Sequence, residues 1–587
     1  MIKGGEFIIK DQKKSEIFIP EDFKNDQIMM ANATTEFVKK ELDIFRVEFE
    51  NKNYKLCAEK LKKAGKLGLL GISIPEKYGG MGLPFTTSVL ICDKISGANG
   101  SFSTAYGAHT GIGTLPILLY GDEKQKQKYL PNLATGEWIG CYCLTEPGAG
   151  SDANAGKTAA TLSSDKKNYT ISGQKMWISN AGYADIFIVF AKIENDKNIT
   201  AFILEKSMNG ITLGEEERKL GLNSSSTRQV FLNDVEVPVT NLLGGRGKGF
   251  KIAMNALNIG RIKLSAAVIE ACKRSISSST KYANQRIQFG NPISKYGAIK
   301  QKLAEMASNT FAVESSTYRA SYEIEKNIKK LISEGVNEQQ AHLKGVEEFA
   351  IECSITKILG SETVQFCTDE GIQILGGMGY SADTPMEAAF RDARISRIYE
   401  GTNEINRLLI VAMLLKKSLK GKINLMEPAM KLASEIMSIP SSEEDDKNDL
   451  LFLEKSSLKK LKKLFLVIAG KTIETYGLRI EEEQEIMMHL ADMCIEIYTA
   501  ESCLLRTDKI KSNEKQKFIH LSQVYMYKSI KKCQNSAEEI IFSFQNLEEK
   551  KLLLLATKRF TKGYTINIKE TRRKVANKLI EENQYCF

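Results

Sequence analysis

The sequence predicts an α+β protein that is mostly helical, with one block of strands between two blocks of helices. Runs rich in β-branched and aromatic residues, separated by turn residues, occupy about residues 138 to 243. The flanking stretches carry apolar residues at helical spacing instead. A chain of 587 residues is also too long for a single hydrophobic core, so several domains are expected.

These changes of pattern divide the chain into six segments. We expect an N-terminal arm at 1–24, a helical domain at 25–137, a β domain at 138–245, a second helical domain at 246–418, a linker at 419–449 and a helical extension at 450–587. The expected strands are WIGCYCLTE (138–146), NYTISGQKMWIS (168–179), ADIFIVFAKI (184–193), ITAFILEK (199–206) and TRQVFLNDVEVP (227–238). Long helices are expected at 250–284, 297–334 and 338–373.

Composition argues against several classes of function. The net charge of +10, from 82 basic and 72 acidic residues, is mild for this length and does not indicate nucleic-acid binding. Eleven cysteines form no C-x-x-C pair, and no two of the four histidines stand at ligand spacing, so no metal is expected. Cys141 and Cys143 are expected to pack in a strand core, in a reducing compartment.

No stretch shows the roughly 20 apolar residues of a membrane span, and the N-terminus lacks the apolar core of a signal peptide. We therefore expect a cytoplasmic protein. A peripheral location on the inner face of the membrane is the alternative, if residues 450–468 dock there.

The stretch RIYEGTNEINRLLIVAM (397–413) is the centre of the functional prediction. Its apolar residues recur at the spacing of one helix face: Ile405, Leu408, Leu409, Ala412 and Met413. Thr402 or Asn403 can cap that helix, so Glu400 lies just before its start, on a turn loosened by Gly401. A carboxylate held there by the backbone can be aimed into a cleft. Taken alone, Glu400 could also be an acid favoured by the helix macrodipole.

The segment YEGTNEINR (399–407), together with LTEPGAGSD (144–152), resembles the acyl-CoA dehydrogenase family. The resemblance runs from about residue 25 to 420, and the extension is similar in length and position to that of the very-long-chain acyl-CoA dehydrogenase subgroup. It implies a helical N-domain, a central β domain, a four-helix-bundle C-domain and an additional C-terminal helical domain.

The resemblance also implies an activity. It is the FAD-dependent α,β-dehydrogenation of a long-chain fatty acyl-CoA to the trans-2-enoyl-CoA, the first step of fatty acid β-oxidation. The family uses the Glu of this motif, here Glu400, as catalytic base, and electron-transfer flavoprotein as electron acceptor. Exclusion of water by the acyl chain should raise the pKa of Glu400. Two alternatives stay open: an acyl-CoA oxidase that uses O2, and a non-catalytic assembly or nucleic-acid-binding member, which the intact Glu400 argues against.

Dehydrogenation needs a base for the α-proton and an acceptor for a hydride, and no side chain accepts hydride. The resemblance assigns the following residues to the family's cofactor, FAD: Tyr142, Leu144, Thr145, Ser151, Trp177, Ile178, Ser179, Arg286, Phe289, Gln373, Gly376, Gly377, Thr402 and Glu404. In the family the elements around Arg286 and Gln373 come from different subunits, so a homo-oligomer, most simply a dimer, is implied. Lys300 stands where many relatives have Gln, which leaves that flavin contact open.

The resemblance assigns these residues to the acyl-CoA substrate: Ser151, Asn258, Arg261, Tyr399 and Gly401. Some branches of the family place the catalytic Glu near residue 258 instead. The local residues here are Asn258, Ile259 and Gly260, without a carboxylate, which favours Glu400 as the base.

Three further stretches leave alternatives open. Small side chains at Gly107, Ala108, Gly111 and Gly113 indicate either room for a long acyl chain or close helix–helix packing. The stretch 244–249 (GGRGKG) looks phosphate-binding but lacks the Lys-Ser/Thr ending of that motif, so we interpret it as a domain connector. Residues 450–468 predict a basic amphipathic helix, which either docks on a membrane or packs on another helix or subunit.

Overall fold

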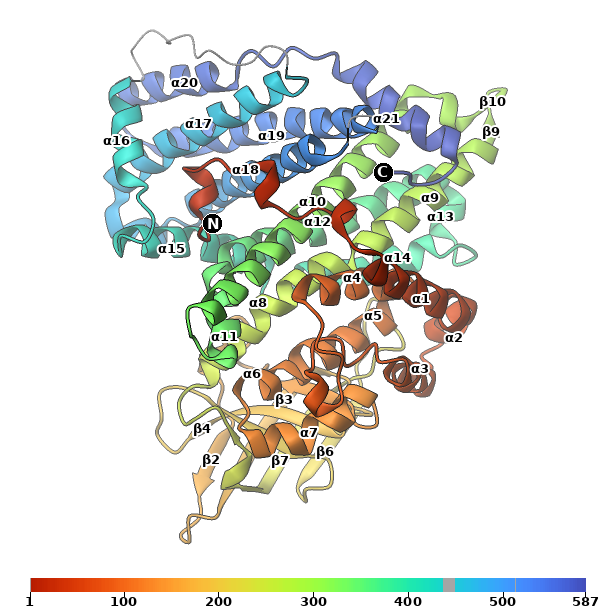
Figure 1. Ribbon diagram of the computed structural model, residues 1–587, viewed down its shortest axis with the longest axis vertical. Helices are drawn as coiled ribbons and strands as arrows, with labels where there is room; N and C mark the ends of the chain where they lie inside the picture. The colour runs from red at the N-terminus through yellow and green to blue at the C-terminus, as the bar shows by residue number, and fades with distance from the viewer. Residues whose placement is uncertain (1, 436–448, 512–513) are drawn as a thin grey trace.

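In the computed structural model the helical extension, the second helical domain and the β domain follow each other along the long axis of the molecule (Figure 1). The structure describes residues 2–435, 449–511 and 514–587. The first helical domain lies beside the second and reaches down to the β domain. This arrangement agrees with the predicted mostly helical α+β class.

The first helical domain contains short helices and one π-helical turn. Its elements are α1 (Asn25–Glu41), α2 (Arg46–Glu50), α3 (Tyr54–Lys66), α4 (Phe85–Ser96), α5 (Gly100–Gly107), the π turn (Ala108–Gly113), α6 (Leu115–Tyr120) and α7 (Glu123–Thr135). The π turn coincides with the small-residue stretch singled out in the sequence. Such turns are often found at functional sites, because they widen a helix locally.

The β domain forms one sheet of order β6-β7-β3-β2-β4-β5-β8, with β1 beside β4. Its strands are β1 (Gly140–Cys143), β2 (Ala159–Leu162), β3 (Asn168–Ser179), β4 (Ile186–Ile193), β5 (Thr200–Glu205), β6 (Ile211–Glu216), β7 (Thr227–Pro238) and β8 (Leu242–Leu243). All five expected strands are present, whereas β2, β6 and β8 are too short or too polar to stand out in the sequence. Cys141 and Cys143 pack in the core, as predicted.

The second helical domain contains long helices near the predicted positions. They are α8 (Gly249–Ala267), α9 (Ile269–Gln285), α10 (Gly297–Ser333), α11 (Glu338–Glu348), α12 (Ala350–Leu375), α13 (Gly377–Tyr380), α14 (Met386–Ala393) and α15 (Asn403–Leu419). A short hairpin of β9 (Ile287–Gln288) and β10 (Asn291–Pro292) follows α9. The span Gly249–Gln285 is long and apolar enough to cross a membrane, but 83% of its most apolar window is buried inside the protein, as in a core helix.

Helix α15 is present as predicted, but its apolar series is not its most buried face. The series Ile405, Leu408, Leu409, Ala412 and Met413 is only half-buried, and the fully buried face lies beside it. That face carries Asn403, Asn406, Arg407, Ile410, Val411, Leu414 and Lys417. Its polar side chains are paired inside the protein: Arg407, for example, bonds Glu362 and Asp492, both at 2.9 Å. Because these partners come from other helices, hydrophobicity along the chain could not reveal this face.

The extension consists of α16 (Met426–Glu435), α17 (Phe452–Tyr476), α18 (Gln484–Lys509), α19 (Lys515–Ser543), α20 (Leu547–Thr561) and α21 (Ile568–Glu582). Helix α16 lies within the segment 419–449 that was expected to be a linker. Most of the polar stretch 440–449, residues 440–448, lies outside the described residues. The connector 244–249 leads from β8 into α8, where Arg246 pairs with Asp196 at 2.8 Å.

The predicted basic amphipathic helix is the first part of α17, and it packs inside the protein. Leu461, Leu464 and Ile468 are fully buried. Lys462 is buried as well, and it pairs with Glu501 at 2.6 Å and with Asp11 of the N-terminal arm at 2.9 Å. The packing alternative therefore describes this helix, and its apolar face is not free to enter a membrane. The same pairs hold the N-terminal arm against the extension.

Candidate functional site

Glu400 stands on a backbone turn that three side chains hold in place. Its φ is +59°, a value that non-glycine residues rarely adopt, and Gly401 follows at +79°. Arg261 Nε donates to the Glu400 carbonyl at 3.2 Å, while Lys357 Nζ and Asn406 Nδ2 each donate to the Gly401 carbonyl at 2.8 Å. These bonds stabilise the unusual turn, as strained functional loops require. Thr402 Oγ1 then accepts from Ile405 N at 3.2 Å and caps α15, as predicted.

The Glu400 carboxyl is buried, and its Oε2 has no hydrogen-bond partner among the described residues. Burial raises its pKa to about 7, against the opposing charges of Arg261 and Lys357. The expected upward shift is therefore confirmed, although burial by the protein itself is sufficient to produce it. A carboxyl that titrates near pH 7 is well matched to general-base work.

Helix α8 passes directly in front of this carboxyl. A β-carbon placed on Gly260 would lie 2.7 Å from Glu400 Oε2, so only glycine leaves room for the carboxylate there. On the same helix, Arg261 Nη1 bonds Asn258 Oδ1 at 2.9 Å, and both residues are buried. The structure thus places Asn258 and Arg261 behind the Glu400 turn.

Sequence reasoning missed Lys357, which lies on α12. Besides the Gly401 carbonyl, its Nζ bonds Asn403 Oδ1 at 2.7 Å. Burial lowers its pKa to about 7, against the attraction of Glu400. No local motif marks this lysine, because its partners lie more than 40 positions further along the chain. The contact of Lys357 with the Glu400 turn is visible only in the packed structure.

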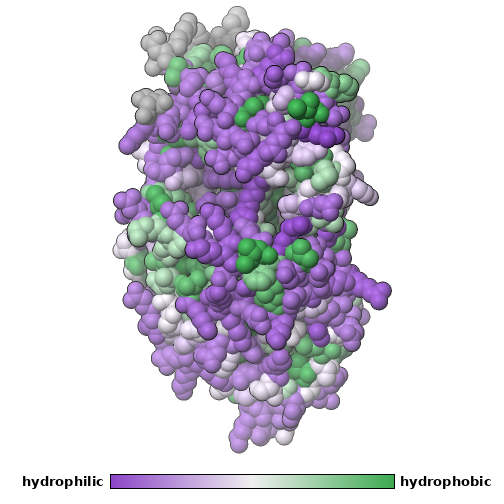
Figure 2. Space-filling model, turned by 90° about the vertical axis from the view of Figure 1, so that its right-hand side faces the viewer, coloured by the Kyte–Doolittle hydropathy of each residue, from purple (hydrophilic) through white to green (hydrophobic). Residues whose placement is uncertain are grey.

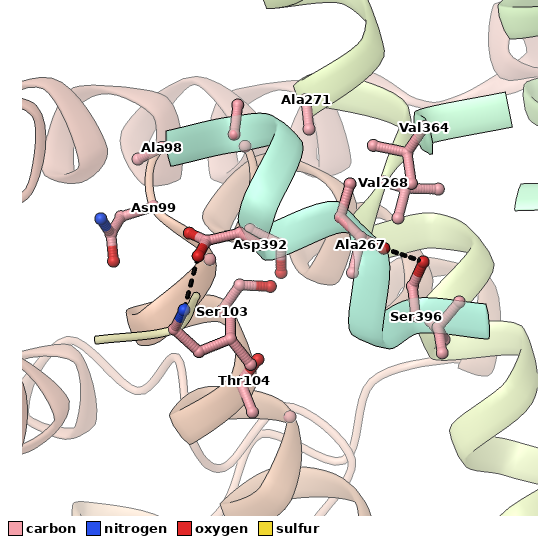
Figure 3. Close-up of a pocket in the computed structure, with 18 of the residues that line it drawn as sticks. Ala98, Asn99, Ser103, Thr104, Ala267, Val268, Ala271, Val364, Asp392 and Ser396 are labelled. Atoms are coloured by element: carbon pink, nitrogen blue, oxygen red, sulfur yellow. Dashed lines mark hydrogen bonds between the residues drawn. The ribbon is translucent and has the colours of Figure 1, made fainter. Parts of the chain in front are cut away.

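A cavity of about 520 Å³ opens beside Glu400 (Figure 3). The α8–α9 side contributes Gly260, Lys263, Ala267, Val268 and Ala271, and the first helical domain contributes Ser103, Thr104, Gly107 and Gly111 opposite them. Figure 3 shows Asn99, Ser103 and Thr104 on one side, with Ala267, Val268 and Ala271 on the other. The residues Ser179 and Tyr399 also line the cavity. A narrow channel with small, mostly apolar walls suits an alkyl chain.

The small-residue stretch 107–113 provides both room for an acyl chain and close packing, each at different residues. A β-carbon on Gly107 or Gly111 would meet nothing within 4 Å, and both residues line the cavity. A β-carbon on Gly113 would instead lie 2.7 Å from the backbone of Gly140, so this glycine allows close packing against β1.

The residues assigned to FAD fall into two groups. The first group lies on β1 and the loop after it, at the end of β3 and at the start of α15, and its Ser179 lines the cavity. Its members are Tyr142, Leu144, Thr145, Ser151, Trp177, Ile178, Ser179, Thr402 and Glu404. Met176 N donates to Thr145 O at 2.9 Å, which brings the end of β1 beside β3. Trp177 is 60% exposed with φ at +57°, although it sits in a strand where core packing would be usual.

The second group lies on another part of the surface: Arg286, Phe289, Gln373, Gly376 and Gly377. The hairpin β9–β10 and helix α13 are far from β3 in Figure 1, so this chain does not bring the two groups together. Phe289 is 93% exposed. Lys300, the departure in this set, bonds Asn577 of α21 at 2.8 Å and so contacts the extension.

Comparison with known proteins agrees with this geometry. Family models match four parts of the chain: the acyl-CoA dehydrogenase N-terminal domain at 24–137, the middle domain at 141–235, and two C-terminal domain models at 247–415 and 460–559. A probable acyl-CoA dehydrogenase of Bacillus subtilis is 42% identical over 99% of this chain and 98% of its own. The chain belongs to the acyl-CoA dehydrogenase family. It is an FAD-dependent oxidoreductase that acts on acyl-CoA.

Two further relatives of this acyl-CoA dehydrogenase are informative. The crystal structure of an acyl-CoA dehydrogenase complexed with FAD from Bacillus anthracis is 40% identical, covers 100% of both chains and superimposes with a TM-score of 0.97. The mitochondrial very long-chain specific acyl-CoA dehydrogenase of Rattus norvegicus is 39% identical over 61% of this chain and 53% of its own. The first similarity includes the extension, so the whole architecture is shared with a solved dehydrogenase.

The first group of residues fits a flavin. The Tyr142 hydroxyl is buried without a partner among the described residues, and the nearby charge of Glu400 contributes to the raised pKa of this hydroxyl after the effect of burial. β-Carbons on Gly148 and Gly150 would meet nothing within 4 Å, so the backbone after β1 is open to a large ligand. Exposed Trp177 supplies an aromatic surface beside this opening. These residues are suited to hold the ring end of FAD, with Arg286 and Gly376 suited to its phosphate end.

Proposed function

We propose that Glu400 removes the α-proton of an acyl-CoA whose chain occupies the 520 Å³ cavity, and that long chains are preferred. The observation that carries this proposal is a buried carboxyl with an unpartnered oxygen, facing Gly260 at the wall of an apolar channel. FAD, when bound, supplies the hydride acceptor that no side chain can provide.

The Glu400 turn offers a second function to the same substrate. The Glu400 backbone N–H donates no hydrogen bond among the described residues, so it is available to the thioester carbonyl oxygen. A hydrogen bond there stabilises the negative charge that develops as the α-proton leaves. Arg261, Lys357 and Asn406 bind the carbonyl side of the same turn. The chain thus orients both the base and the oxyanion donor through one loop.

Channel length supports a long chain. Cavity-lining residues follow α8 and α9 from Gly260 to Ser278, a helical rise of about 27 Å at 1.5 Å per residue. An extended chain advances about 1.2 Å per bond, so roughly 22 bonds fit along this wall. Chains of about 16 carbons should therefore be covered over their full length, with each added methylene contributing about 0.8 kcal/mol of burial.

Replacement of Glu400 by Gln tests the assignment, because Gln has nearly the same shape but cannot accept a proton. The holoenzyme is mixed anaerobically with acyl-CoAs of increasing length. Reduction of the bound flavin is followed as loss of its absorbance at about 450 nm. We expect retained FAD and fold, with flavin reduction lowered about a thousandfold or more. Reduction by Glu400→Gln at close to the wild-type rate would contradict the proposal.

We further propose that electron-transfer flavoprotein accepts the electrons, as in the family. Reoxidation of the reduced enzyme by this flavoprotein is compared with reoxidation by O2 in the same buffer. Fast peroxide formation with slow transfer to the flavoprotein would favour the oxidase alternative.

We also propose that two copies of the chain complete each FAD site. The second group of FAD residues lies on a surface with exposed apolar side chains, where Phe289 is 93% and Tyr380 is 84% exposed. Figure 2 faces the side of the molecule on which α13 and α14 lie, and it shows apolar side chains gathered at mid-height. Light scattering of Phe289→Asp against wild type tests this. A dimer mass is expected for wild type and a smaller mass with loss of FAD for Phe289→Asp, whereas a monomer mass for the wild-type holoenzyme would contradict the dimer.

A further inference from the structure

A lysine lies in the wall of the cavity. Lys263, on α8, lines the cavity between Gly260 and Ala267 and is 7% exposed. No hydrogen bond or ion pair of its ammonium group is present in the described part of the chain, residues 2–435, 449–511 and 514–587. The other cations that line the cavity, Arg46 and Arg274, are bonded to protein oxygens, as are Arg261 and Lys357 beside the Glu400 turn. Lys263 is thus a nearly buried cation without a partner beside the substrate channel.

The neighbours of Lys263 offer it no anion. The Cys92 thiol, on α4, donates to the Lys263 carbonyl at 3.4 Å. Burial raises the pKa of this thiol to about 11, so the thiol is uncharged at neutral pH. His109, in the π turn, is uncharged as well, because burial lowers its pKa to about 4. Its Nδ1 accepts from Gly140 N at 3.0 Å and its Nε2 lies 2.9 Å from Leu133 O, so both ring nitrogens are occupied.

Burial of an unpaired ammonium group is costly, by several kcal/mol for an ion in a protein interior. Burial accordingly lowers the pKa of Lys263. A plain alkyl chain in the channel would cover the amine with more apolar surface and increase this cost. A carboxylate on the chain would do the reverse, because it provides both the opposite charge and hydrogen-bond acceptors.

We propose that Lys263 is a specificity residue that binds a carboxylate on the acyl chain, so that ω-carboxyacyl-CoA thioesters are substrates. This inference rests on the proposed function, since it requires the acyl chain to lie in this cavity. The carboxylate of the substrate supplies the anion that Lys263 lacks, while the thioester end remains at Glu400.

The position of Lys263 limits the length of such substrates. Lys263 stands three positions after Gly260 on α8, which is a rise of about 4.5 Å along the helix. Helical side chains lean towards the N-terminus of their helix, which here is the direction of Glu400. An acyl chain advances about 1.2 Å per bond, so a carboxylate about four to eight bonds beyond the reacting carbons reaches the amine. Among ω-carboxyacyl-CoA thioesters, those of medium-length dicarboxylic acids therefore fit best.

The test compares wild type with Lys263→Met, which keeps the length and apolar stem of the side chain without its charge. Both holoenzymes are assayed with plain acyl-CoAs and with ω-carboxyacyl-CoAs of six to twelve carbons, a range chosen from the reach of about four to eight bonds. We expect Lys263→Met to lower kcat/KM for the best ω-carboxyacyl-CoA by about tenfold to a hundredfold, the loss typical of one charged hydrogen bond. We expect kcat/KM for plain chains to stay equal or rise.

Binding is measured separately from turnover in Glu400→Gln and in the double variant Glu400→Gln/Lys263→Met, by calorimetry with the same thioesters. The double variant should bind the ω-carboxyacyl-CoA more weakly and the plain acyl-CoA at least as tightly. A merely structural role of Lys263 would weaken both ligands together, which would overturn the inference. Failure of wild type to oxidise any ω-carboxyacyl-CoA would overturn it too, while oxidation of plain acyl-CoA would leave the proposed function intact.

Discussion

Replacement of Lys357 by Met should change how the dehydrogenase responds to pH. Lys357 donates to the carbonyl of Gly401 at 2.8 Å and to Asn403 Oδ1 at 2.7 Å, and its charge opposes the rise in the pKa of Glu400. Methionine keeps the apolar volume but removes both the charge and the two bonds. The electrostatic contribution of Lys357 depends on pH, whereas its contribution to loop geometry does not, so the pH profile of the variant separates the two.

The electrostatic effect can be estimated from the wild-type values. The pKa of Glu400 is already about 7 with both cations present. An opposite charge nearby lowers the pKa of a carboxyl by about one unit or more, so loss of Lys357 should raise it to about 8. At pH 7 the ionised fraction of Glu400 then falls from about one half towards about one tenth, a loss in rate of at most about fivefold, because Lys357 itself is only partly charged at this pH. At pH 9 the two proteins should differ little.

The assay is the anaerobic reduction of the bound flavin by acyl-CoA, measured between pH 6 and 9. Because Lys357 itself titrates near pH 7, the wild-type profile belongs to the pair and should be broader than that of the variant. Other groups that interact with Glu400 are Arg261 on α8 and Tyr142 on β1, while Glu362 on α12 and Glu404 on α15 interact with Lys357. They are unchanged in the variant. Lys357→Arg, which keeps the charge, is the matched control.

Two results would refute this reasoning. A profile of Lys357→Met that coincides with wild type would mean that the cation does not act on Glu400. A rate that is equally low at every pH, with FAD retained, would mean that Lys357 only positions the loop.

The remaining predictions concern three other positions. Gly111→Leu should lower kcat/KM for long acyl-CoAs more than for short ones, because the new side chain enters the cavity; an equal loss at all lengths would contradict this. Gly260→Ala should retain FAD and lower flavin reduction about tenfold to a hundredfold, because its β-carbon would lie 2.7 Å from Glu400 Oε2 and displace the base; a wild-type rate would refute the contact. Glu352 is buried, accepts from Gly5 N at 2.7 Å, and has its pKa raised to about 7 by burial. A carboxyl whose folded pKa exceeds its unfolded one stabilises the protein at low pH and loses that contribution as pH rises through 7. Glu352→Gln should therefore raise the melting temperature at pH 8 relative to wild type, with a gain of at most about 3 kcal/mol, and an equal effect at pH 4 would contradict the linkage.

The order of domains and most of the long elements could be predicted from the sequence. Strand β3 and strand β7 have the bounds of the runs 168–179 and 227–238, and α10 begins at the predicted residue, because hydrophobic periodicity and turn residues are local properties. The Glu400 motif was equally readable, since the turn, the cap and the acid lie within four residues. A catalytic motif made of consecutive residues can therefore be recognised from the sequence alone.

The buried polar face of α15 and the burial of Lys462 on α17 could not be predicted in the same way. Both helices bury charged side chains, such as Arg407 and Lys462, whose partners lie far away in the chain. Without those partners a buried charge is too costly, so sequence reasoning assigned the apolar residues to the core and the lysines to solvent or membrane. Which side chains neutralise one another is a property of packing.

The site shows the same division. The identity of Glu400, the absence of a carboxylate at 258–260 and the small residues 107–111 were present in the sequence from the start. Only the folded chain set Gly260 against the Glu400 carboxyl, Lys357 behind its turn, and Lys263 in the channel wall. The types of residue determine which chemistry is available, while burial and the distances between elements decide the pKa of the base and which substrates its channel accepts, because both depend on groups that meet only in three dimensions.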